Sequence, residues 1–559
     1  MKKLNLLPLV LLFFIVFIFF RPFFLQGKLP IPSDTIIGLY HPFRDLYSKE
    51  YPNGIPFKNF LITDPVRQQF PWRELAISML KRFELPLWNP YSFSGTPLLA
   101  NMQSASFYPL NVLFFILPFD ISWSILIVLE LLLGGLFLYL YLNNLKINKW
   151  ARLLGSISFS FSGFFIAWME WGTILHVGMW LPLILLSIDK IFFHYLRSRH
   201  SGERSESRIS FPARFWTSSS TVLSSSLPKD QSDGVYRNLA WSLIFIFSLS
   251  SALFAGHLQT FFYLFLFSTT YFFARWIQFG WQKRTLFLFI ILNSLFIIFT
   301  SVQWMPTLQF ILESARSVDI PHWQKEGWFI PWQHLIQFIA PDFFGNPSTL
   351  NYWGVWNYGE FIGYIGILPL MMAIFALFFR HDKKTLFYGS IFFISIIFSL
   401  PTIFAKLPYI LHIPLLSSAQ PTRLLFILDF SLAVLAAFGL DYFIRTKKRE
   451  ILYSLIFISL IIVTLWVLVL SGNNIIKLIS LENLSVAKNN LILPTVLFIA
   501  SASLLLFFRL LSKSKLLTLM IRIIIVAIIT FDLVRFGWKF TPFSPKEYLF
   551  PNTKAIEFL

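Results

Sequence analysis

The 559-residue chain contains no cysteine, and charged residues make up only 13% of it. The absence of cysteine excludes disulfide bonds, thiolate catalysis and metal sites built on cysteine ligands. A soluble globular protein carries about 25% charged residues, so this chain has too little polar surface for a soluble fold of its length. Hydrophobic residues make up 56% of the chain and its mean hydropathy is +0.66. The composition therefore predicts an integral membrane protein.

Long apolar stretches recur along the whole chain. A membrane-spanning helix needs about 20 apolar residues, and thirteen stretches reach or approach that length. They are residues 6–25, 121–141, 153–171, 174–195, 239–254, 258–277, 286–305, 361–379, 386–400, 424–443, 451–470, 491–510 and 516–536. We predict an all-α polytopic membrane protein with about 13 transmembrane helices.

The net charge of +19 comes from basic residues scattered in short clusters between the apolar stretches. A nucleic-acid-binding protein would gather them on one surface, so no nucleic-acid partner is predicted. Lys and Arg instead gather in cytoplasmic loops of membrane proteins. Lys2 and Lys3 precede the first apolar stretch, and no signal-peptide cleavage site follows it. We therefore predict a multi-pass plasma-membrane protein with a cytoplasmic N-terminus and, for 13 spans, an extracytoplasmic C-terminus.

This topology divides the chain into six regions. They are a first transmembrane helix (1–25), an extracytoplasmic first loop with interfacial helices and the candidate catalytic region (26–120), a transmembrane bundle (121–305), a second outer loop (306–360), a C-terminal transmembrane bundle (361–536) and an extracytoplasmic tail (537–559). Within the first bundle, the Ser- and Arg-rich stretch 197–237 predicts a disordered cytoplasmic loop. The tail ends soon after the last span, which suggests truncation.

Part of the first loop has the pattern of an amphipathic helix. Residues 73–83 mix apolar side chains such as Leu75 and Met79 with basic ones such as Arg73 and Lys81 at helical spacing. This pattern predicts a helix that lies on the membrane surface with its charged side chains in water.

Three aspartates in the first loop are candidates for acid–base chemistry. A sugar hydroxyl needs a positioned carboxylate base to attack at neutral pH. Asp34 lies about ten residues after the first span, at the depth of a lipid head group, and Asp64 precedes Gln68 by four residues. The other reading of Asp34, Asp45 and Asp64 is that they are solvated carboxylates or helix caps.

Candidate binding residues are spread over several loops. Arg423, at the outer end of a predicted span, suits a carrier phosphate, although it can equally snorkel at the interface. Glu360 is a candidate second carboxylate for an acceptor or a metal. His257 and Gln259 are candidate hydrogen-bonding partners of a sugar or phosphate, and a structural role is the alternative for the histidine. No cluster has metal-ligand spacing, so we assign no metal ligands and leave a divalent metal open.

Further candidates come from motifs in the first loop and from acids within spans. Trp88 can stack on a sugar face, and Asn89 and Gln103 are polar neighbours in the same region. Carboxylates are costly at mid-bilayer, so acids inside predicted spans are functional candidates or are paired within the bundle. Among such acids we single out Glu130, Asp429 and Asp532.

Several motifs together carry a resemblance to a known family. They are Asp64, Gln68 and Pro71, then Pro86–Tyr91, Gly95–Pro97, Phe107–Asn111, Gly256–Gln259, Gly359–Glu360 with Tyr364 and Gly366, Pro421–Arg423 and Phe438–Asp441. In this order and over the whole chain, the sequence resembles the YfhO-like bacterial membrane proteins, which look like members of the GT-C superfamily of glycosyltransferases.

The resemblance implies a GT-C-like helical bundle and transfer of a sugar from a polyprenyl-phosphate donor. The acceptor would be an extracytoplasmic cell-envelope polymer, lipid or protein. It also implies a catalytic aspartate shortly after the first span; by position this residue is Asp34 and by the D-x-x-x-Q motif it is Asp64, and both stay candidates.

Two other functions fit the composition. A lipid or glycan transporter would show internal symmetry and spans broken by Gly or Pro in matching positions of two halves. A non-catalytic scaffold would keep the fold without making a product. Polar residues are concentrated in the outer loops, which favours chemistry at the membrane surface.

Overall fold

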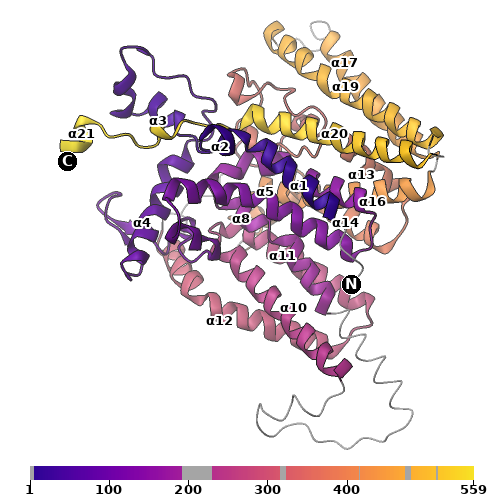
Figure 1. The fold of residues 1–559 in the computed structure, drawn as a ribbon, viewed down its shortest axis with the longest axis horizontal. Helices are drawn as coiled ribbons and strands as arrows, with labels where there is room; N and C mark the ends of the chain where they lie inside the picture. Colours follow the sequence, from indigo (N-terminus) through magenta and orange to yellow (C-terminus); the bar gives the residue numbers. More distant parts are fainter. Residues whose placement is uncertain are drawn as a thin grey trace, which may run out of the picture.

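The computed structural model describes residues 6–191, 229–314, 323–413, 416–447, 449–471, 480–511 and 514–558. Within these ranges the chain is mostly helical (Figure 1). The only named strands there form one antiparallel hairpin, in which β1 (Trp88–Asn89) pairs with β2 (Thr96–Pro97). The predicted all-α class is confirmed.

The α-helices follow the apolar stretches closely. They are α1 (Leu6–Phe19), α2 (Arg21–Gln26), α3 (Asp34–Leu39), α4 (Phe70–Lys81), α5 (Phe119–Asn144), α6 (Lys149–Ser160), α7 (Gly163–Trp168), α8 (Ile174–Gly178), α10 (Lys229–Phe254), α11 (Leu258–Gln278), α12 (Lys283–Glu313), α13 (Ile367–Phe379), α14 (Lys383–Ser399), α15 (Ile403–Ile410), α16 (Leu425–Thr446), α17 (Ile451–Leu470), α19 (Leu481–Leu511), α20 (Lys515–Phe540) and α21 (Lys554–Phe558).

Short 3-10 helices and one π-helical turn, η2, lie between these helices. They are η1 (Phe43–Tyr47), η2 (Pro65–Gln69), η3 (Met102–Ser104), η4 (Pro109–Phe115), η5 (Met169–Trp171), η7 (Trp332–Phe338), η8 (Pro347–Thr349), η9 (Tyr358–Glu360), η10 (Pro421–Leu424) and η11 (Lys546–Tyr548).

Eight helical segments of the described chain are long and apolar enough to cross a membrane. A ninth results if α14 and α15, which are bent by 63° relative to each other, count as one span. These segments support a multi-pass membrane protein. Three further apolar helices, Leu6–Phe19, Asn238–Phe254 and Ile367–Phe379, are shorter, so the count of 13 spans stays a prediction.

Helix α16 lies in the interior of the bundle, in contact with α6, α13 and α14. In the segment Pro421–Thr446, 94% of the most apolar window is buried, compared with 28% for α12. Glycines allow the neighbouring backbones to approach α16 closely, as is usual between membrane helices. A Cβ atom on Gly439 would lie 1.9 Å from the carbonyl oxygen of Met372 in α13, and one on Gly155 of α6 would lie 2.9 Å from that of Ala433.

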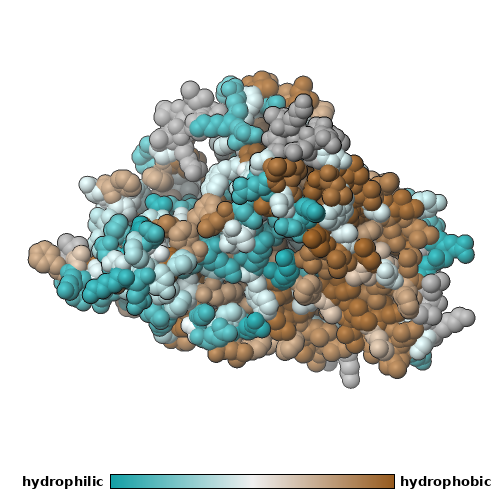
Figure 2. Space-filling view, turned by 90° about the horizontal axis from the view of Figure 1, so that it is seen from above, coloured by the Kyte–Doolittle hydropathy of each residue, from teal (hydrophilic) through white to brown (hydrophobic). Residues whose placement is uncertain are grey.

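Polar and apolar surfaces are segregated. Figure 2 shows hydrophobic residues over much of one side and hydrophilic residues at the end where, in Figure 1, α3, α4 and the C-terminus lie. Helices α12, α17, α19 and α20 bury only 28–39% of their apolar windows, so much of their surface is available to lipid. This arrangement fits a bundle with a polar cap of loops at one end.

Two features of the first half differ from the sequence-based expectation. Helix α4 forms, but Arg73 lies on its buried side with Phe70 and Ile77 and is fully buried. The expectation that Arg73 faces water was therefore wrong, while the position of the helix on a membrane surface stays a prediction. In the predicted loop 197–237, residues 229–237 belong to α10, and residues 197–228 lie outside the described residues.

The C-terminal tail packs on the first loop. The backbones of Leu29 and Ser544 pair as an antiparallel bridge. The rings of Tyr47 and Tyr548 lie 5.8 Å apart, and Lys546 is 2.8 Å from the carboxylate of Asp120. Residues after α20 thus form one side of the polar cap.

The close contact at Gly439 predicts a strong effect of a single methyl group. Gly439→Ala should lower the free energy of unfolding by about 1–3 kcal/mol, because the backbone oxygen of Met372 cannot move aside without displacing α13. The thermal unfolding midpoint in detergent measures this effect. Gly389→Ala is the control, since its Cβ would meet only the end of the Leu377 side chain; equal losses in both variants would contradict the close-packing explanation.

Candidate functional site

Asp34 is held rigidly at the start of α3. Its Oδ2 accepts a hydrogen bond of 2.7 Å from the backbone N–H of Lys58, and its Oδ1 accepts one of 3.1 Å from the N–H of Thr35. The backbone N–H of Asp34 itself donates to Oγ of Ser544 at 3.2 Å. The side chain is 8% exposed. Asp34 is therefore a positioned carboxylate and not a solvated one.

The environment of Asp34 makes its carboxylate a stronger base than a free aspartate. Burial raises the pKa of Asp34, and the hydrogen bonds from the Lys58 backbone and the Ser544 hydroxyl partly oppose that rise. A raised pKa brings a carboxylate closer to the range in which it can accept a proton from a hydroxyl near neutral pH.

A cation and a second acid lie within electrostatic range of Asp34. The Lys58 ammonium donates to the carbonyl oxygen of Trp538 at the end of α20, at 2.5 Å. Burial lowers the pKa of Lys58, while the nearby carboxylates of Glu170 and Asp34 oppose that shift. Asp34, Lys58 and Glu170 form what we call the Asp34 cluster.

Glu170 is the least satisfied member of this cluster. It is 1% exposed, and neither carboxyl oxygen has a hydrogen-bond partner among the residues described. Buried carboxyl groups normally have hydrogen-bond partners, because leaving one without a partner costs about 1–3 kcal/mol or more. Glu170 is therefore a functional candidate.

The short turn η5, between α7 and α8, connects this cluster to a second one. Trp168, just before η5, lies under Arg423, whose Cζ is 3.7 Å from the centre of the indole ring. The indole N–H of Trp168 donates to the carbonyl oxygen of Gly359 at 3.0 Å. Two residues further on, Glu170 belongs to the Asp34 cluster. The Cα atoms of Trp168 and Glu170 are at most about 7 Å apart along the chain.

Arg423 and Glu360 meet in this second cluster, although they lie far apart in the sequence. Nη2 of Arg423 is 2.8 Å from Oε1 of Glu360, and the hydroxyl of Thr422 donates to Oε2 at 2.6 Å. The Nη1 of Arg423 is buried and has no hydrogen-bond partner in the described part of the chain. We call Trp168, Glu360, Thr422 and Arg423 the Arg423 cluster.

Gln259 contacts the segment that leads into Arg423. Its amide nitrogen donates to the carbonyl oxygen of Gln420 at 2.5 Å, and the hydroxyl of Tyr263 donates to the same oxygen at 3.3 Å. His257 precedes α11 and accepts from the backbone N–H of Thr260 at 3.2 Å. The imidazole of His257 thus caps α11, while Gln259 connects α11 to the Arg423 cluster.

Gln103 lies next to the turn before α11. Its Oε1 accepts from the side-chain amide of Gln69 at 2.8 Å, and a Cβ on Gly256 would lie 3.4 Å from its Cα. This pairing connects η2 and η3 of the first loop with the α10–α11 turn.

Asp64 and Gln68 form a local pair. The Gln68 amide is 3.4 Å from Oδ1 of Asp64, and both side chains are partly exposed. Residues of η2, just after Asp64, contact η5. Asp64 thus lies in the neighbourhood of Glu170, with fewer hydrogen bonds than Asp34.

Trp88 and Asn89 lie in the β1–β2 hairpin. Asn89 is buried, accepts from the backbone N–H of Tyr91 at 2.9 Å and donates to Ser92 at 3.1 Å. Trp88 is 50% exposed and lies over Gly95, where a Cβ would come within 2.5 Å of the indole. Asn89 stabilises the turn, and Trp88 presents half of its surface outward.

A third buried polar group joins the first loop to the bundle. Arg73 donates to the carbonyl oxygen of Gly172 at 2.8 Å and lies 5.1 Å from the ring of Trp123. Burial lowers the pKa of Arg73 to about 10, an effect that Tyr108 and Glu130 oppose.

His176 lies between Glu130 and Tyr108. Its Nε2 is 3.2 Å from Oε1 of Glu130, without the alignment of a hydrogen bond, and its Nδ1 is 3.1 Å from the hydroxyl of Tyr108. Both Glu130 and His176 are fully buried. Glu130, an acid within a predicted span, thus belongs to a buried polar network that also includes residues of the first loop.

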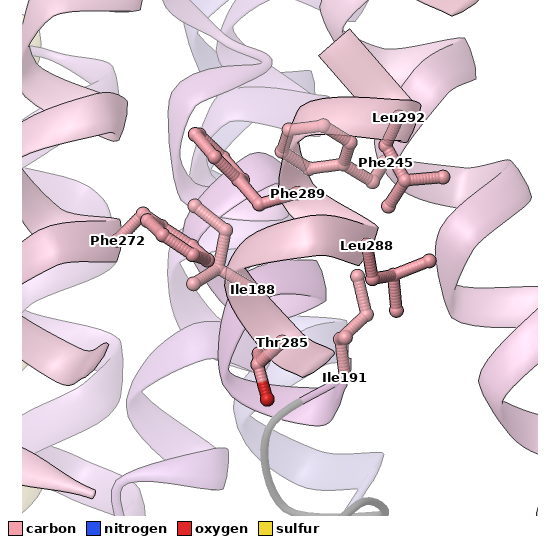
Figure 3. Close-up of a pocket in the computed structure, with 8 residues that line it drawn as sticks. All are labelled: Ile188, Ile191, Phe245, Phe272, Thr285, Leu288, Phe289 and Leu292. Carbon is pink, nitrogen blue, oxygen red and sulfur yellow. The ribbon is translucent and has the colours of Figure 1, made fainter. Parts of the chain in front are cut away.

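Two other features bear on ligands. Figure 3 shows a pocket lined by eight side chains that are apolar except for Thr285, and it offers no group for acid–base chemistry. In the ranges that the structure describes, no group of three or more His, Asp or Glu side chains is arranged to hold a metal ion.

Comparison of the chain with protein-family models, with curated proteins and with solved structures finds no match.

The sequence analysis did not identify Lys58 or Glu170 as candidate site residues, and it did not predict that Arg73 is buried. Glu170 lies near the end of an apolar stretch, close to Trp168 and Trp171, where an acidic residue is usually assigned to the membrane interface. Its charge within a predicted span was the signal that could have found it. Lys58 gives no such signal, because only the folded loop brings it to Asp34.

The burial of Arg73 leads to a stability prediction. Arg73→Met should lower the free energy of unfolding by about 3–5 kcal/mol, because Glu130 would lose its neighbouring cation in a buried site. The additional change Glu130→Gln should recover part of the loss. Thermal unfolding in detergent measures both. The control is Arg82→Met, which removes an exposed ion pair with Glu84 and should lower the free energy of unfolding by at most about 1 kcal/mol. An equally small decrease in Arg73→Met would refute the assignment of Arg73 as a buried stabilising cation.

Proposed function

We propose that the protein is a membrane glycosyltransferase that moves a sugar from a polyprenyl-phosphate carrier to an extracytoplasmic acceptor with inversion at the anomeric carbon. The observation that carries the proposal is the Asp34 cluster, in which a buried carboxylate is held by two backbone N–H groups beside Lys58 and Glu170. Such a cluster at the polar end of an apolar bundle suits a substrate with a polar head and an apolar tail.

Asp34 is the base in this proposal. The acceptor hydroxyl gives its proton to an Asp34 carboxylate oxygen, and the acceptor oxygen attacks the anomeric carbon. The bond between that carbon and the phosphate oxygen breaks, and its electron pair leaves with polyprenyl phosphate. Asp34 is preferred to Asp64 because its carboxylate is more buried and has more hydrogen bonds.

Two cations are available for the leaving phosphate. Arg423 has one buried nitrogen without a hydrogen-bond partner in the described chain, and the flat Trp168 ring supports its guanidinium from one side. Lys58 is the cation nearest to Asp34. Donors placed where negative charge develops lower the barrier to transfer. Gln259 and Glu360 position Arg423, and Glu360 keeps the group near neutral before substrate binds.

The proposal includes the finer topology predicted from sequence. The chain crosses the plasma membrane about 13 times with the N-terminus in the cytoplasm, so the polar cap faces outward. The positive-inside distribution of Lys and Arg along the sequence supports this orientation.

Transport of a lipid or glycan is the second candidate, favoured by one observation. The bent pair α14 and α15 resembles the interrupted helices of transporters. A transporter would move a labelled glycolipid across sealed vesicles without forming a covalent product, whereas the glycosyltransferase releases polyprenyl phosphate.

The base assignment leads to a kinetic prediction. Asp34→Asn should lower transfer about 10²–10⁴-fold, because the base is lost while its side-chain volume is kept. Mass spectrometry of released polyprenyl phosphate measures the rate, in nanodiscs that hold polyprenyl-phosphate hexoses and cell-envelope extract.

Two matched variants complete this experiment. Asp45→Asn changes an exposed aspartate of the same loop, paired with His41 at 2.7 Å, and should keep full activity. Asp64→Asn tests the other candidate base. If Asp64→Asn abolishes transfer while Asp34→Asn stays fully active, Asp64 and not Asp34 is the base.

The raised pKa of Asp34 also predicts a pH dependence. The base must be deprotonated, so kcat/KM should fall as pH drops through a pKa that lies above the ordinary aspartate value. Ser544→Ala removes a hydroxyl that favours the carboxylate, so the acidic limb should move to higher pH with the plateau rate unchanged. Ser48→Ala, an exposed serine of the same loop, should leave the profile in place. An unshifted limb in Ser544→Ala would argue against Asp34.

A further inference from the structure

A second polar pocket lies at the same end of the bundle, away from the Asp34 cluster. It is formed between α19, α20 and the segment that begins at Pro341, and it measures about 380 Å³ including its open side. Its lining includes Asn489, Asn490, Leu493, Leu497, Arg535 and Phe536. The end of α20 separates the two sites, because Lys58 contacts the carbonyl oxygen of Trp538 while the next residue, Lys539, contacts Asp342.

The two carboxylates that line this pocket are already satisfied within the protein. Asp342 accepts from Lys539 at 2.7 Å and from the hydroxyl of Tyr358 at 3.1 Å. Asp532 accepts from the hydroxyl of Tyr364 at 2.7 Å and from the backbone N–H of Ile367 at 3.1 Å. These contacts leave little acceptor capacity for a cationic ligand.

Arg535 has the opposite character. Its side chain is exposed at the pocket, and within the described ranges it makes no ion pair shorter than 4 Å. Asn489 adds an exposed amide, and Asn490 donates to the carbonyl oxygen of Asp342 at 2.7 Å. The accessible polar groups of the pocket are therefore one guanidinium and neighbouring amides, which suit the oxygens of a phosphate.

The other part of the lining is apolar and continues onto the outer surface. Leu493, Leu497 and Phe536 line the pocket, and Val496 and Phe531 on the same two helices are 53% and 56% exposed. Both helices are candidate spans, with only 33% and 39% of their apolar windows buried. A molecule with its head at Arg535 would have its hydrocarbon chain against this surface.

We propose that this pocket binds a membrane phospholipid, with the phosphate at Arg535 and Asn489 and an acyl chain along Leu493 and Leu497. The lipid is not the sugar donor, because the pocket and the Asp34 cluster lie on different sides of the end of α20. The proposal therefore stands or falls independently of the glycosyltransferase activity. A lipid in this place would hold α19 against α20 at the polar end of the bundle.

Binding of defined short-chain lipids to the purified full-length protein tests this proposal. Native mass spectrometry with dioctanoyl phosphatidylglycerol should show saturable binding, and Arg535→Gln together with Asn489→Ala should weaken it at least tenfold. Both side chains are exposed, so these variants should keep the thermal midpoint of the unmodified protein. Arg522→Gln, near the other end of α20, is the matched control and should bind as the unmodified protein does.

Two further probes identify what is recognised. Dioctanoylglycerol lacks the phosphate and should bind at least tenfold more weakly, whereas glycerol phosphate lacks the chains and should not compete. Equal binding of dioctanoylglycerol would overturn phosphate recognition, and competition by glycerol phosphate would show a site for a soluble phosphate ester instead of a lipid. Equal loss in Arg535→Gln and Arg522→Gln, or no loss in either, would overturn the site.

Discussion

The contact between Arg73 and Gly172 determines where the first loop lies on the bundle. A fully buried guanidinium in α4 donates to a backbone carbonyl at the α7–α8 connection, close to the Glu130 carboxyl in α5. Removing a guanidinium from water is costly, and the hydrogen bond from Nη2 to Gly172 offsets part of that cost, although Nη1 has no partner in the described chain. The contact with Gly172 fixes the loop against the same short connection from which Trp168 and Glu170 reach the two polar clusters. The candidate site therefore depends on a contact that takes no part in the chemistry.

The connection itself joins two candidate spans, Lys149–Trp171 and Ile174–Ile191, both almost completely buried. It is a short turn, and Gly172 within it has a positive φ of 61° that favours glycine. The backbone carbonyls of such a turn need hydrogen-bond partners, and Arg73 of the first loop supplies one to Gly172. The first loop also contacts the turn through η2, which lies against η5. The turn places Trp168 against Arg423 and Glu170 within electrostatic range of Lys58.

The sequence predicted the all-α class and several long apolar helices correctly, because the length of an apolar stretch can be read without knowing how the helices pack. It also singled out Glu360 and Arg423 separately, from charge at the end of apolar stretches, and the structure brings them together as an ion pair. It was wrong about Arg73, because an amphipathic pattern assigns every basic residue to the water side. That rule fails when a buried acid such as Glu130 faces the helix. The burial of Asp34 depends on Lys58 and Ser544, which come from distant parts of the chain, so no local pattern could have distinguished Asp34 from Asp64.

The polar groups at the loop-covered end of the bundle divide into two kinds. Asp342 pairs with Lys539 and accepts a hydrogen bond from Tyr358, and Asp532 accepts one from Tyr364. These two acids therefore stabilise the packing of α20 against α13 and the segment 323–360. Glu170 and Nη1 of Arg423 are equally buried but lack hydrogen-bond partners in the part of the chain described. Buried polar groups without partners among the described residues also occur in the Arg73 network, at Glu130 and at Nη1 of Arg73, so this feature marks candidate groups in both networks and agrees with the ligand binding proposed near η5.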